Sequence, residues 1–110
     1  MQVKTKFLIL NNFLNALLLD FGASLNTISS YKSDLEEFLN FIKNPVLATT
    51  DDINNFILNL YKNSKKPTTI ARKISSIKKF YKFLMDEKEI KENPTCFINK
   101  PRYKRNLVKT

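Results

Sequence analysis

The sequence contains no histidine, no tryptophan, one glycine and one cysteine. A single cysteine, Cys96, excludes an internal disulfide and fits a reducing compartment, so the sequence predicts a cytoplasmic protein. One glycine and four prolines provide few tight turns, which disfavours a many-stranded sheet and favours long helices. These scarcities predict an all-α fold.

The chain also has no apolar run long enough to cross a membrane. The densest run covers residues 7–21 and is interrupted by three asparagines and one aspartate. Lys4 and Lys6 precede it, as basic residues do in a signal peptide, but the asparagines and the lack of a small-residue cleavage site argue against one. We therefore predict no membrane contact.

The length and the hydrophobic content are those of one folded domain. The chain has 110 residues, of which 43% are hydrophobic, and nine are phenylalanine. This is enough for a core without disulfides or metals. We predict a helical domain over residues 1–99, with residues 100–110 as a basic linker or tail.

Positive charge is abundant and unevenly placed. The net charge is +9, with eight basic and no acidic residues over 53–85, and five basic and no acidic residues over 93–110. Such segregation attracts polyanions. Double-stranded DNA is the favoured partner, ahead of an acidic membrane surface, because no amphipathic segment is free of core packing.

Apolar residues recur at spacings of three and four and predict four main helices. These cover about residues 4–21, 26–43, 50–62 and 68–86, arranged as a compact orthogonal bundle with a short C-terminal turn or helix. In the first helix, Leu18 and Leu19 widen a buried stripe that ends at Phe21.

Helix ends are marked by residues that suit caps. Gly22 suits a left-handed C-terminal cap, and Ser24 or Asn26 can cap the second helix. Thr49 or Thr50 can cap the third, and Pro67 fits the first turn of the fourth.

The fourth predicted helix carries the clearest candidate binding face. One side is apolar; the other offers hydroxyls and cations without an acid, namely Thr69, Arg72, Lys73, Ser76 and Lys79. That combination suits a phosphate-lined surface. A merely solvated face is an equally consistent interpretation from this helix alone.

Residue types that commonly carry catalysis have structural interpretations here. Asp51 and Asp52 suit a helix cap and its dipole better than a metal site. None of the four tyrosines has a base at helical spacing, and Cys96 suits a small apolar filler. We predict no catalytic residue, no metal and no cofactor.

Several sequence segments resemble the N-terminal core-binding, SAM-like domain of tyrosine recombinases of the phage-integrase and Xer type. They are residues 24–39, with their asparagine-threonine, tyrosine and aspartate-leucine pattern; residues 69–84, with their alanine-arginine-basic, serine and phenylalanine-tyrosine pattern; Asp52-Ile53; and Asn93-Pro94. The resemblance covers nearly the whole chain, in the family's order and spacing.

The resemblance implies a four-helix bundle that covers one side of a recombination site, with the second and fourth helices across the major groove. The DNA contacts it implies, together with the basic loop before the fourth helix, are Asn26, Thr27, Lys32, Lys66, Thr68, Thr69, Arg72, Lys73, Ser76 and Lys79. Arg72 is the candidate for reading a guanine edge. Full-length relatives would assemble as recombinase subunits in a synaptic tetramer, whereas the isolated domain is expected to be a monomer.

In this family the chemistry belongs to a separate catalytic domain, which uses tyrosine, arginine, histidine and lysine. This chain has no histidine and no segment that resembles that domain, so we predict that it is not itself an enzyme. Two alternatives remain open. One is a helical protein–protein interaction module, and the other is a standalone helix-turn-helix regulator.

Overall fold

The computed structural model describes residues 6–98. It contains four helices, α1 (Lys6–Phe21), α2 (Leu25–Phe41), α3 (Thr50–Lys62) and α4 (Pro67–Asp86), and no strand within the described residues. The predicted all-α bundle is confirmed. The predicted tail, 100–110, lies outside the described residues.

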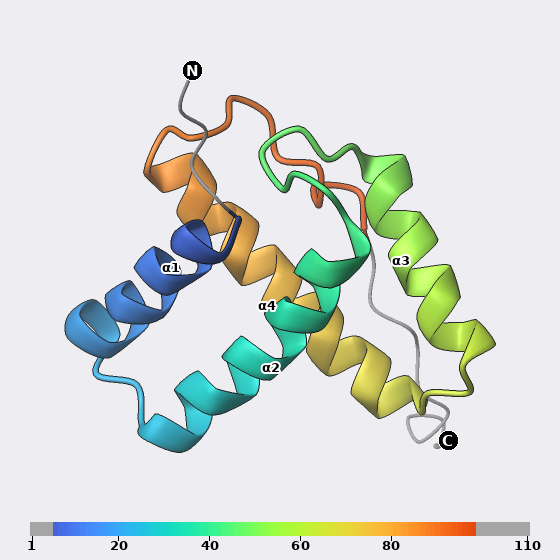
Figure 1. The fold of residues 1–110 in the computed structure, drawn as a ribbon, viewed down its shortest axis with the longest axis horizontal. Coiled ribbons are helices and arrows are strands. Elements are labelled where there is room, and N and C mark those ends of the chain that lie inside the picture. Colours follow the sequence, from blue (N-terminus) through green and yellow to red (C-terminus); the bar gives the residue numbers. More distant parts are fainter. Residues whose placement is uncertain (1–5, 99–110) are drawn as a thin grey trace, which may run out of the picture.

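The fold is organised around α4, which runs diagonally through the centre of the molecule (Figure 1). Helices α1 and α2 pack against each other, and α2 also packs on α4. Helix α3 packs on α4 as well, on the side opposite α1 in Figure 1. Helix α2 therefore connects α1 with α4.

Side-chain caps fix where α2 and α3 begin. Ser24 accepts a hydrogen bond from the Thr27 backbone N–H at 3.1 Å and so caps α2. At α3, Thr49 and Asp52 form a capping box, each side chain accepting from the other's backbone N–H. This confirms Asp52 as a capping residue.

The turns between the helices contain Gly22 and Pro67 at the places predicted from the sequence. Gly22 has φ of +63°, a left-handed conformation that costs glycine little. Pro67 occupies the first turn of α4. Helix α2 ends at Phe41, two residues before the predicted boundary, because Ile42 is already extended ahead of Asn44 and Pro45.

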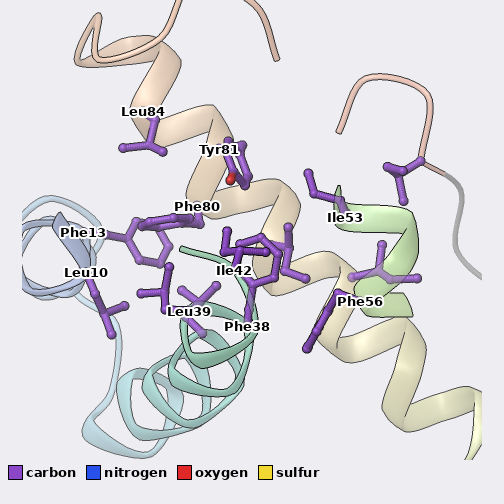
Figure 2. Close-up of a cluster of buried hydrophobic side chains, with 14 of the residues drawn as sticks. Leu10, Phe13, Phe38, Leu39, Ile42, Ile53, Phe56, Phe80, Tyr81 and Leu84 are labelled. Atoms are coloured by element: carbon purple, nitrogen blue, oxygen red, sulfur yellow. The ribbon is translucent and has the colours of Figure 1, made fainter. Parts of the chain in front are cut away.

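Aromatic side chains fill the centre of the core (Figure 2). Phe13 of α1 meets Phe80 edge-on, with ring centroids 5.5 Å apart, and Phe38 of α2 meets Phe56 of α3 at 5.2 Å. Tyr81 is fully buried, and its hydroxyl donates to the Pro45 carbonyl at 2.7 Å. The Phe38 ring also meets that of Tyr81 edge-on, at 6.1 Å between centroids, so the aromatic rings join all four helices. Edge-to-face pairs add about 0.5–1.5 kcal/mol each beyond area burial.

Three apolar predictions for α1 are wrong. Leu18, Leu19 and Phe21 are exposed, because the buried stripe of α1 is narrow and ends at Leu17. Phe21 lies one turn after Leu17 on the same face, but it is the last residue of the helix and its side chain is exposed.

The segment after α4 forms turns within the described residues, and the prediction for Cys96 is wrong. Ile98 is buried and Ile90 packs against the core, whereas Phe97 and Cys96 are exposed, so Cys96 does not fill the core. No helix in the described part of the chain is both long and apolar enough to cross a membrane.

Candidate nucleic-acid interface

The predicted contact residues lie on α2 and α4 and on the turn that precedes α4. The N-terminal ends of both helices lie at the lower side of the view in Figure 1, and the helices cross above them. In this view the first turn of α2 lies at the lower left and that of α4 at the lower right, on either side of the crossing. Free backbone N–H groups at helix N-termini favour anions.

A buried carboxylate joins the two helices where they cross. Asp34 of α2 is only 1% exposed and accepts hydrogen bonds from three side chains of α4. Arg72 donates twice, from Nε at 3.1 Å and from Nη2 at 2.7 Å. Lys73 Nζ lies 3.2 Å and Ser76 Oγ 2.9 Å from the same carboxylate.

A second acid of α2 completes this network. Glu37 lies 2.6 Å from Lys73 Nζ, so the ammonium is held between two carboxylates. Asp34, Glu37, Arg72 and Lys73 together carry no net charge at neutral pH. We call these four residues and Ser76 the Asp34 network.

The network keeps its central acid ionised. Burial alone raises the pKa of Asp34, but hydrogen bonds from Arg72, Ser76 and Lys73, with the charge of Lys73, together hold that pKa below its ordinary value. The hydrogen bond to Asp34 in turn raises the pKa of Arg72. Both groups are therefore charged at neutral pH.

The network corrects the predicted exposed face of α4. Lys73 is 6% exposed and Ser76 is 3% exposed, and their polar atoms point at Asp34. The prediction that no acid shares this face considered α4 alone, whereas α2 brings two acids against it. Lys73 and Ser76 are thus placed in the interior, and only Arg72 of the three projects outward, with 57% of its side chain exposed.

The remaining predicted residues lie at or near the surface. Those that are exposed are Asn26, Thr27 and Lys32 on α2, Lys66 before α4, and Thr68 and Lys79 on α4; Thr69 is half-buried. Thr27 shares a hydrogen bond with Ser24, and the Lys79 ammonium lies 5.4 Å from the centroid of the Phe21 ring.

Sequence reasoning did not identify Asp34 and Glu37 as part of this site, although a signal was present. Asp34 follows Tyr31 by three residues and precedes Phe38 by four, which is the spacing of the buried stripe. Lys73 has the same relation to Ile70 and Ile77 on α4. An acid and a base that both occupy core positions on different helices predict a buried pair.

Metal-ligating side chains do not cluster in the part of the chain that the structure describes, and its buried tyrosine has a structural role. In residues 6–98, no set of three or more histidine, cysteine, aspartate or glutamate side chains could hold a metal ion. Burial raises the pKa of Tyr81, so its hydroxyl remains protonated and serves as a donor to Pro45. Tyr103 lies outside the described residues.

Comparison with known proteins identifies the family. The family described as phage integrase, N-terminal SAM-like domain, matches residues 10–88. This chain belongs to it. The match includes α2, α3 and α4 in full and most of α1.

The similar curated proteins are Xer tyrosine recombinases. The chain is 41% identical over 109 residues to tyrosine recombinase XerC of Thermodesulfovibrio yellowstonii, a match that covers 98% of this chain and 36% of that protein. It is 39% identical over 102 residues to tyrosine recombinase XerD of Rickettsia bellii, covering 89% of this chain and 33% of that protein. The chain therefore spans about a third of the length of these relatives. No solved structure matched it.

Proposed function

We propose that this domain binds duplex DNA as the N-terminal module of a site-specific tyrosine recombinase that acts on DNA in the cytoplasm. The observation that carries the proposal is the family match over residues 10–88. The exposed cations and hydroxyls on α2 and α4 support it, because such groups bind phosphates and fix the register of a protein on the duplex.

Within this proposal the contact surface consists of exposed groups on α2 and on the N-terminal part of α4. Asn26, Thr27 and Lys32 contact the DNA backbone from α2. Lys66, just before α4, and Thr68 and Arg72 on α4 also contact DNA. Thr69 and Lys79 lie at the edges of this surface. Lys73 and Ser76 act indirectly, by fixing how α2 and α4 cross.

Strand exchange is proposed for a longer protein of which this domain is one part, since the relatives are about three times as long as the match. In such a protein, subunits would assemble into a synaptic tetramer and the chemistry would lie beyond the matched region. The domain alone is expected to be a monomer that binds weakly, because it covers only one side of the duplex.

Fluorescence anisotropy with a labelled duplex tests the proposal. We expect binding at 50 mM salt that weakens steeply by 200 mM, as counterion release requires. An unlabelled duplex should compete, and an acidic polypeptide of equal charge should compete less well. No binding to any duplex at low salt would overturn the proposal.

A protein-binding role is the second candidate, and one observation favours it. Leu19, Phe21 and Leu25, around the turn between α1 and α2, are each at least 70% exposed. Exposed apolar clusters of this kind mark interaction sites. Self-association in sedimentation experiments without DNA, lost in a Leu19→Ser/Leu25→Ser variant, would support it.

A further inference from the structure

We propose that Asp34 is a positioning residue that holds the Arg72 guanidinium in one orientation, with its outer edge directed to read a guanine in the major groove. The inference rests on the proposed DNA-binding function. It adds a specificity-determining pair to it, in which one member is buried and never touches DNA.

Asp34 occupies one edge of the guanidinium and leaves the other edge free. The bonds from Nε and Nη2 to the two carboxylate oxygens use the inner edge, so two of the five N–H groups of Arg72 are engaged. The outer edge, formed by Nη1 and the second N–H of Nη2, has no side-chain partner among residues 6–98. That edge is a complete two-donor fork.

The carboxylate that orients Arg72 is itself immobilised. Lys73, the residue after Arg72, and Ser76, one turn further along α4, also donate to Asp34, which lies buried where the helices cross. The carboxylate cannot rotate without breaking these bonds. Arg72 is therefore attached to a fixed point, and a planar group held on one edge loses little further freedom when it binds.

Charge balance distinguishes base reading from phosphate binding. The Asp34 network carries no net charge, so Arg72 adds little to the field that attracts phosphates. Arg72 can still form directional hydrogen bonds, because the two donors of its free edge match the O6 and N7 acceptors of guanine. Exposed lysines such as Lys32 and Lys66, without carboxylate partners in the described part of the chain, supply the phosphate attraction instead.

Selection of bound duplexes from a random library tests this assignment. We expect the wild-type chain to prefer guanine at one position by about five- to 150-fold, the discrimination of a bidentate contact. Arg72→Gln and Arg72→Lys should both remove that preference, although lysine keeps the charge. Lys82→Gln is the matched control, since it removes another α4 cation that is paired with an aspartate, Asp86, at 3.3 Å, and it should keep the preference.

Asp34→Asn should change two measurements in opposite directions. The guanine preference should fall because the fork is no longer fixed, while salt dependence should steepen because the Arg72 charge is no longer compensated. A purely structural role for Asp34 predicts neither change in a variant that melts cooperatively. If Asp34→Asn does not fold, the two Arg72 variants still test the guanine reading that the proposal requires, and an unchanged guanine preference in either would overturn it.

Several outcomes would overturn the assignment. One is an unchanged guanine preference in Arg72→Lys. Another is a uniform loss of affinity in Arg72→Gln with a salt slope lower by about one, which indicates a phosphate contact. Duplex binding by the wild type without any base preference refutes the Asp34–Arg72 role and leaves the proposed function intact, whereas absence of duplex binding refutes both.

Discussion

Replacing Asp34 by alanine should destabilise the domain by about 2–3 kcal/mol at pH 7. Breaking a buried ion pair from one side typically costs about 3–5 kcal/mol, because the partner charge is left uncompensated. Here two features lower the cost. Arg72 has 57% of its side chain exposed and can be hydrated, and Lys73 retains Glu37 at 2.6 Å.

Urea denaturation followed by far-ultraviolet circular dichroism measures this change. The melting temperature should fall by about 8–24 °C, given the usual 4–8 °C per kcal/mol for a domain of this size. Glu36→Ala is the control, since Glu36 is a half-buried acid on the same helix, and it should change stability by less than about 0.5 kcal/mol. Equal effects of the two substitutions would refute the role given to Asp34.

The difference in unfolding free energy between the wild type and Asp34→Ala should depend on pH. The pKa of Asp34 is lowered in the folded state, so its stabilising contribution is present above the unfolded value of about 3.9 and is lost as the pH falls through the folded pKa. The stability difference between wild type and Asp34→Ala should therefore shrink below about pH 4. A difference that is constant from pH 7 to pH 3 contradicts the bonding described here.

Three further predictions test the fold by the same denaturation assay. Thr49→Ala removes one half of the α3 capping box and should cost about 1 kcal/mol, whereas Thr49→Ser should cost little. Tyr81→Phe leaves the buried Pro45 carbonyl without its donor and should cost about 1–3 kcal/mol; a neutral result would mean that water replaces the hydroxyl. Phe38→Ala, at a fully buried position between α3 and α4, should cost about 3–5 kcal/mol, and exposed Phe97→Ala should be near neutral.

Helix number, order and most helix ends were predictable from the sequence, because they depend on local chemistry. The spacing of apolar residues, Gly22, the Thr49–Asp52 box and Pro67 each act within a few residues. The errors at Leu18, Leu19 and Phe21 have a different origin. Periodicity shows which residues share a face, but the width and length of the buried stripe depend on where the neighbouring helix ends.

The candidate site was only partly predictable for the same reason. Composition and family resemblance indicated α2 and α4, but α4 considered alone seemed to have an acid-free basic face. The acids that pair with it come from α2, and Asp34 lies 38 residues before Arg72 and 39 before Lys73. Such a long-range pairing follows from how two helices cross, which neither helix encodes by itself.

The salt dependence of duplex binding tests the central claim most directly, namely that exposed cations on α2 and before α4 hold DNA. For Lys32→Ala/Lys66→Ala, the slope of log affinity against log salt should fall by about two, one for each lost phosphate contact. Lys43→Ala/Lys91→Ala, which removes two exposed cations elsewhere, should keep the wild-type slope. Equal slopes in all three proteins, or equal losses in the two variants, would contradict the account.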